Sequence, residues 1–158
     1  MNNFRDLIRQ KQKLTEEECI SILVNEKRGV LSVNGDNGYP YGMPMNHFYQ
    51  DGILYFHGGK VGHKIDSLRK DNKVSYCVYD QGYKNENEWH LNIKSVIVFG
   101  KMELIEDPSI IEDISRKLSY KFTNDDNYIE EEIKKSLNGT LLLALKIENM
   151  TGKIVKEK

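Results

Sequence analysis

Two turn signals near the N-terminus constrain the fold more than any other feature of this chain. The first is the run 34–38, which holds two Asn-Gly pairs and follows the β-rich residues 29–33. The second is the pair Asp51-Gly52, which precedes another β-rich run. Asn, Asp and Gly adopt the positive φ angles of tight hairpins more readily than other residues. The sequence therefore predicts three antiparallel strands, with residues 39–49 in the middle.

Two prolines make this middle strand unusual. Pro40 and Pro44 each lack a backbone donor, and prolines in sheets lie at edges or bulges. We therefore expect something other than a regular strand beside it. The unpaired backbone groups could bind the edge of a flat heterocycle, or the segment could be a plain irregular edge strand.

The other expected elements follow at irregular intervals. Thr15 and Glu18 have the spacing of a capping box, which predicts a helix over 15–27, with Leu14 packed on Cys19 as a hydrophobic staple. Further strands are expected at 53–57, 74–79, 93–106 and 140–147. Further helices are expected from Gly62 to about Asn72, over 108–122, and for a turn or two after 130–132, with a charged tail at the end.

The composition is that of an ordinary globular domain. The 158 residues carry 23 Lys plus Arg against 24 Asp plus Glu and are 39% apolar. We expect one α+β domain over residues 1–158, built on an antiparallel sheet or barrel. The charge balance argues against nucleic acid or an anionic membrane as a partner. No signal sequence and no apolar run near ~20 residues is visible, so the cytoplasm is the expected location.

Few residues have the spacing of a metal site or a catalytic nucleophile. The histidines are scattered along the chain: His47, His57, His63 and His90. Cys19 and Cys77 form no metal-binding motif, so we expect no metal and two reduced, packed thiols. No serine lies in a G-x-S-x-G context, which argues against a hydrolase of that kind. Trp89 is a lid over a pocket, a subunit anchor or a packed loop residue.

The run 56–67 favours ligand binding. Three glycines lead from a strand into a helix, and such turns present backbone N–H groups and a positive helix end to a phosphate. Three side chains add donors: Lys60, His63 and Lys64. The spacing matches neither the P-loop nor the dinucleotide fingerprint. The run is thus either an anion site or an ordinary glycine-rich loop.

Six motifs, in order along nearly the whole chain, carry a family resemblance. They are RGVLS (28–32), GYPYGMPMN (38–46), YFHGG (55–59), GHK (62–64), SVIVFGK (95–101) and TGK (151–153). Together they resemble the flavin-binding split-barrel proteins related to pyridoxamine 5′-phosphate oxidase, and most of all the branch of the 5-nitroimidazole resistance proteins. The resemblance implies a mainly β, six-stranded antiparallel split β-barrel with flanking helices. It also implies a homodimer with FMN in a groove at the dimer interface.

The resemblance further implies site residues. The cofactor-binding residues would be Pro44, Met45, Asn46, Phe56, His57, Gly58, His63, Lys64, Lys94 and Ser95. In this set His63 and Lys64 replace the phosphate-binding Arg-Lys pair of the oxidase, and the partner subunit would supply Ser95 with Lys94 beside it. Histidine is only partly charged near neutral pH and lacks the bidentate fork of arginine. We therefore expect FMN binding that is weaker and depends on pH.

On this resemblance we expect an FMN-dependent oxidoreductase. It would pass electrons from NADH or NADPH to a small electron-poor acceptor, such as a nitroimidazole or another nitroaromatic, with His57 as the catalytic proton donor. Residues 150–158 lack counterparts of the oxidase's substrate-phosphate residues, which argues against pyridoxamine phosphate oxidation. The alternatives are a non-catalytic flavin or haem carrier or sensor, and a dimeric scaffold with an empty groove.

Overall fold

The structure is a computed structural model that describes residues 3–157 and contains one seven-stranded antiparallel sheet. Met1, Asn2 and Lys158 of the expected domain lie outside the described residues. The strands are β1 (Arg28–Asn34), β2 (Pro40–Asn46), β3 (Phe48–Gln50), β4 (Ile53–Gly59), β5 (Lys73–Tyr79), β6 (Leu91–Ile105) and β7 (Thr140–Glu157). The helices are α1 (Glu16–Asn25), α2 (His63–Lys70), α3 (Pro108–Ser119) and α4 (Asp126–Ser136), with short 3-10 turns η1 (Gln10–Gln12), η2 (Asp36–Gly38) and η3 (Leu137–Gly139).

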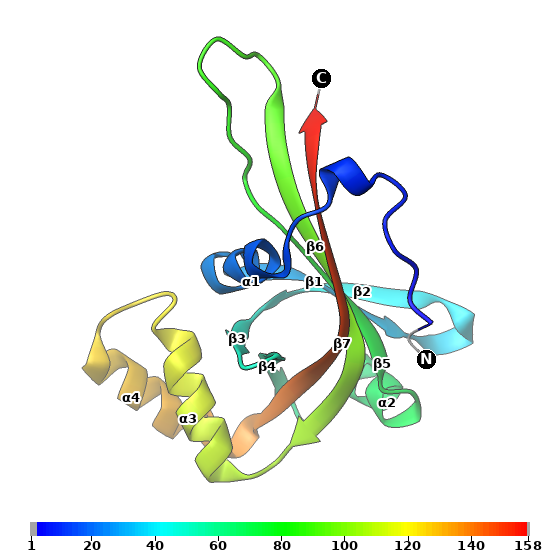
Figure 1. Cartoon of the computed structure of the whole chain (residues 1–158). Helices are drawn as coiled ribbons and strands as arrows, with labels where there is room; N and C mark the ends of the chain where they lie inside the picture. The colour runs from blue at the N-terminus through cyan, green and yellow to red at the C-terminus, as the bar shows by residue number, and fades with distance from the viewer. Residues whose placement is uncertain (1–2, 158) are drawn as a thin grey trace.

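The strand order shows that the sheet curls on itself. The order is β2-β1-β5-β6-β7-β4-β3, so β2 and β3 are the two outermost strands. His47 alone separates them along the chain, so the two edges of the sheet must meet at this residue. Figure 1 shows the resulting curl. This curled sheet is the predicted split barrel, and the expected single strand 39–49 is bent at His47 into β2 and β3.

Both predicted turns adopt the expected backbone. Asn37 and Gly38 have φ angles of 57° and 76°, and Asp51 and Gly52 have φ angles of 50° and 79°. Antiparallel pairs form on either side of each turn, β1 with β2 and β3 with β4. The prolines are explained as well, because β2 is an edge strand.

Two expectations about the C-terminal half are wrong. The predicted charged tail after residue 147 is instead the second half of β7. Strand β7 pairs with β6 over most of its length, from Leu91↔Glu157 to Ile105↔Leu142. In Figure 1 the outer parts of β6 and β7 rise together beyond the barrel. The helical turn or two expected after 130–132 is instead the 11-residue helix α4, which begins at Asp126 because the Asp125 side chain caps it by accepting from the Tyr128 N–H. Ladder bonds and a cap stabilise these segments despite their polar side chains.

Two cores hold the fold together. The larger one fills the barrel and includes the fully buried side chains of Leu31, Phe56 and Tyr76. The smaller one lies under α3 and contains Ile111, Ile114 and Leu142 of β7. Because α3 packs on the outside of the sheet, its side chains can reach outward-facing residues of β4.

The predicted start of α1 is confirmed. Thr15 and Glu18 make a reciprocal capping box, and Leu14 and Cys19 are both buried in the larger core. Both cysteines are free thiols. Within residues 3–157, no helix combines the length and apolar character needed to span a bilayer.

Candidate functional site

A cleft of about 470 Å³ brings part of the predicted site together. Within the described part of the chain, residues of β1, β2, β4 and α3 line this cleft: Arg28, Pro44, Met45, Asn46, His57 and Leu118. The four members on β2 and β4 are predicted site residues. The volume lies in the range of about 300–1,000 Å³ that is usual for small-molecule sites.

The pleat of the sheet decides what β2 presents to the cleft. Met43 and Met45 are half-buried and pack against the barrel core. Pro44 and Asn46 alternate with them and are exposed, opposite Val30 and Arg28 in the β1 register. Because β2 pairs with a strand on one side only, its other edge leaves backbone groups open to a ligand.

A side chain of α3 fixes the orientation of the His57 ring. Its Nε2 lies 2.7 Å from the Ser115 hydroxyl, and Ser115 is itself buried. Burial lowers the pKa of His57 below its ordinary value of 6.5, so the ring is neutral near pH 7. One ring nitrogen is thus fixed by Ser115, which leaves Nδ1 to hold or move a proton.

The glycine loop places one lysine beside this cleft. The Lys64 Nζ lies 3.7 Å from the Met45 sulfur, and among the described residues no carboxylate lies within ion-pair distance of it. Burial lowers the pKa of Lys64. Gly58 lies next to this lysine, since a Cβ at Gly58 would stand in ordinary contact, 3.7 Å from the Lys64 Nζ. A half-buried ammonium without a counter-charge favours an anionic ligand.

His63 is placed differently from Lys64. Its ring stacks on Tyr41 with 4.2 Å between ring centroids, and its Nε2 accepts from the Asp36 N–H at 3.3 Å. The Asp36 carboxylate lies 3.6 Å from the same nitrogen. In this structure the predicted phosphate ligand His63 is therefore tied to the η2 turn.

Besides Gly58, His63 and Lys64, three more predicted site residues lie outside the cleft lining: Phe56, Lys94 and Ser95. Phe56 is fully buried and packs edge-on against Tyr76, so only its backbone can reach a ligand. Lys94 and Ser95 lie on β6, where Ser95 pairs with Tyr79. A single copy of the chain does not bring these two β6 residues into the lining of the cleft.

Sequence reasoning about chemistry missed Arg28 and Leu118. Arg28 is the first residue of β1 and has no diagnostic spacing, although the RGVLS motif contains it. It also lines an adjoining cavity of about 640 Å³, so the two hollows meet at Arg28 and Pro44. Among the described residues that line the cleft, Arg28 alone carries a formal charge. The side chains that line the cleft therefore carry a net positive charge.

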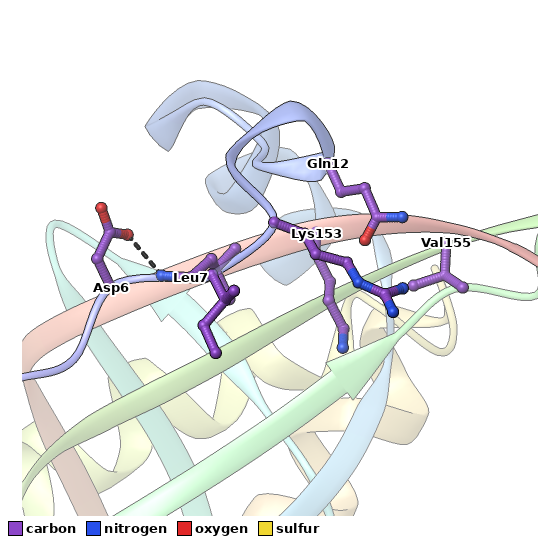
Figure 2. A pocket seen from close by; sticks show the side chains of 7 residues that line it. Asp6, Leu7, Gln12, Lys153 and Val155 are labelled. Carbon is purple, nitrogen blue, oxygen red and sulfur yellow. Dashed lines mark hydrogen bonds between the residues drawn. The ribbon is translucent and has the colours of Figure 1, made fainter.

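A separate pocket of about 450 Å³ lies at the N-terminal segment, over β7. Figure 2 shows Leu7, Lys153 and Val155 around it, with the Asp6 carboxylate accepting from the Leu7 N–H at 2.8 Å. None of the predicted site residues lines this pocket. Over residues 3–157, no three His, Cys, Asp or Glu side chains gather where a metal ion could bind.

Comparison with known proteins relates the chain to one family. A family model described as pyridoxamine 5′-phosphate oxidase matches residues 15–154. No curated protein matches the sequence. Many solved structures share the fold.

One is described as a candidate 5-nitroimidazole antibiotic resistance protein from Bacteroides thetaiotaomicron, with 21% identity, a TM-score of 0.79, and coverage of 92% of this chain and 87% of that chain. An FAD-binding protein from Mesorhizobium loti has 23% identity, a TM-score of 0.68, and coverage of 91% and 97%. An FAD and haem binding protein from Mycobacterium smegmatis has 20% identity, a TM-score of 0.72, and coverage of 92% and 73%. At these identities the likeness establishes the fold.

Proposed function

Because the chain belongs to the pyridoxamine 5′-phosphate oxidase family, we propose that it is an FMN-dependent oxidoreductase whose flavin binds in the cleft between β2 and β4. One observation carries this proposal. Pro44, Met45, Asn46 and His57, from two separate strands, line a single cleft, and the Lys64 ammonium lies next to it. Structural neighbours whose descriptions name a flavin support the cofactor class.

The residues present fit FMN in both of its parts. The open edge of β2 offers backbone groups to a flat ring, and Met45 and Leu118 offer apolar surface. The half-buried Lys64 lacks a carboxylate partner among the described residues and would pair with the phosphate. When bound, FMN supplies the electron transfer.

The chain's own residues would orient the reactants and handle protons. We assign the proton donor role to His57, whose ring is held by Ser115 and lies at the cleft. Because this ring is neutral at rest, it would first take up a proton from solvent and then deliver it to the reduced acceptor. The positive charge of Arg28 would favour an electron-poor acceptor that gains negative charge as it is reduced. Nitroimidazoles and other nitroaromatics fit this description. NADH or NADPH is the proposed electron donor. Such a donor and the two free thiols both fit a cytoplasmic protein.

A homodimer is the proposed assembly. The outer face of β1, β5 and β6 exposes apolar side chains, with Val30 at 41% and Ile97 and Phe99 each at 39% exposure. Val30 and Ile97 flank Cys77 in the register, and Pro44 pairs with Val30 on the same face. A second copy packed on this face would border the cleft. It would also explain how Lys94 and Ser95 could approach a flavin held by the partner subunit.

A non-catalytic flavin or haem binding protein is the second candidate. The Mycobacterium smegmatis protein, which is described as binding FAD and haem, favours it through the shared fold. The two candidates differ in whether a bound flavin accepts electrons from a nicotinamide and passes them on.

Anaerobic reduction separates these candidates. The protein is loaded with FMN, freed of excess cofactor and mixed with NADH or NADPH without oxygen, while the visible flavin bands are followed. We expect the bands to bleach and to return when a nitroimidazole is added. Bands that persist with both donors would contradict the oxidoreductase and favour the carrier.

A further inference from the structure

His47 is a buried corner residue to which the proposed function gives no role. It is the single residue between β2 and β3, and it is 0% exposed. Its Nε2 lies 2.7 Å from the Leu23 carbonyl, and its Nδ1 lies 2.7 Å from the Tyr76 hydroxyl. Its backbone N–H donates to the Lys27 carbonyl at 3.1 Å, and its carbonyl accepts from the Lys121 Nζ at 2.7 Å. Because all of its polar groups are bonded, the corner has one well-defined conformation.

The protons of this network can be assigned. A carbonyl only accepts, so the His47 Nε2 carries a proton and donates to Leu23. Burial, with a smaller effect of Lys121, lowers the pKa of His47 to about 4, so the ring is neutral near pH 7 and Nδ1 accepts. Tyr76 must then be the donor, and its hydroxyl also lies 2.9 Å from the Met45 carbonyl. The single hydroxyl proton of Tyr76 is thus shared between two acceptors, the His47 Nδ1 at the corner and the Met45 carbonyl on β2.

Met45 links this buried pair to the cleft. The Met45 carbonyl accepts a hydrogen bond from the Tyr76 hydroxyl inside the barrel. Met45 also lines the cleft, and its sulfur lies 3.7 Å from the Lys64 Nζ. Gly29, opposite Met45 on β1, lets the Tyr76 ring approach, because a Cβ at Gly29 would lie 2.8 Å from the Tyr76 Cζ. A displacement of Tyr76 would therefore move both the cleft wall and the lysine beside it.

We propose that Tyr76 and His47 are positioning residues, which hold Met45 and thereby set the cleft wall and Lys64 in the arrangement that binds the flavin. Both act from the interior of the barrel, through the Met45 backbone. Their role rests on the function proposed above, since it concerns the same site.

Paired tyrosine variants test this role. Tyr76→Phe removes the hydroxyl and keeps the ring, whereas Tyr49→Phe removes a hydroxyl that accepts from the Gly52 N–H at 3.2 Å on β3. The measurements are the FMN dissociation constant, the visible circular dichroism of the bound flavin and the melting temperature. We expect Tyr76→Phe to raise the dissociation constant about three- to tenfold and to change the visible signal. Tyr49→Phe should leave both flavin readouts unchanged, even if it melts earlier.

The outcomes are distinguishable. A folded Tyr76→Phe variant that binds FMN like the wild type, with the same visible signal, overturns the positioning role and leaves the proposed function standing. If Tyr76→Phe does not fold, His47→Gln decides, because its amide can still donate to Leu23 but places no acceptor at the Nδ1 position that Tyr76 uses. A changed visible signal in His47→Gln supports the role, and an unchanged one overturns it. A wild-type protein that binds no FMN overturns the proposed function and this role together.

Discussion

Lys64 is the residue on which the phosphate end of the proposed site depends. Its half-buried ammonium has a sulfur atom beside it, and the described residues offer it no carboxylate. Replacing Lys64 with Ala should lower FMN affinity about tenfold or more, since a hydrogen bond to a charged group contributes about 1.5–3 kcal/mol. Flavin fluorescence titration measures this change. Lys60→Ala, in the loop just before α2 and exposed, is the control and should bind FMN normally. Equal affinities for all three proteins would remove Lys64 from the site.

His57 has a role that can be separated from cofactor binding. Replacing His57 with Gln keeps a polar group near Ser115 but removes the titrating ring. If His57 delivers a proton, reoxidation of the reduced protein by a nitroaromatic should slow by about 10²-fold or more. Reduction by NADH or NADPH should change little. Stopped-flow measurement of the two half-reactions checks this, and equal slowing of both would argue against a proton donor.

The β2–β3 corner predicts how stability depends on pH. The ordinary histidine pKa of 6.5 falls to about 4 at His47, so between these values the unfolded chain binds a proton that the folded chain does not. Stability should therefore decrease as pH falls from 6.5 towards 4, by about 3 kcal/mol from this residue. The facing groups do not titrate there, because burial lowers the pKa of Lys121 only to about 8 and raises that of Tyr76.

Urea unfolding at several pH values measures this dependence. His47→Gln should flatten the decline in acid, whereas His57→Gln, which removes a half-buried histidine, should leave the His47 contribution in place. The same slope in the wild type and in His47→Gln would show that the corner histidine is not the source.

Elements with strong local signals were predictable from the sequence, and elements held by long-range pairing were not. The capping box of Thr15 and Glu18 and the turn at Asp51-Gly52 depend on neighbouring residues, so their patterns sufficed. The outer half of β7 is stabilised by ladder bonds to β6, a partner far away in the sequence. Its mixture of apolar and charged side chains gives no local sign of that pairing.

The same distinction holds for the candidate site. Pro44, Met45, Asn46 and His57 were predictable through motifs on single strands. Leu118 reaches the cleft only because α3 packs outside the sheet, and its helical spacing indicates nothing more than a core position. The link from Tyr76 to His47 joins residues 29 positions apart and has no sequence pattern.

At the scale of the whole molecule, the proposed dimer has a direct test. Ile97→Glu places a charge in the middle of the outer sheet face, so it should weaken self-association more than about 100-fold, because an unpaired buried charge costs about 3–5 kcal/mol. FMN affinity should fall with it if the partner subunit completes the site. Ile110→Glu on α3, similarly exposed at 42%, is the control. Analytical ultracentrifugation decides, and an Ile97→Glu protein that associates like the wild type would contradict this interface.

The most direct test of the whole account is the visible absorption spectrum of the purified wild-type protein, recorded before and after FMN is added and the excess removed. The account predicts flavin bands that stay with the protein, in the first spectrum or after loading. Protein that shows no flavin bands in either spectrum would contradict the central claim that the cleft between β2 and β4 is a flavin site.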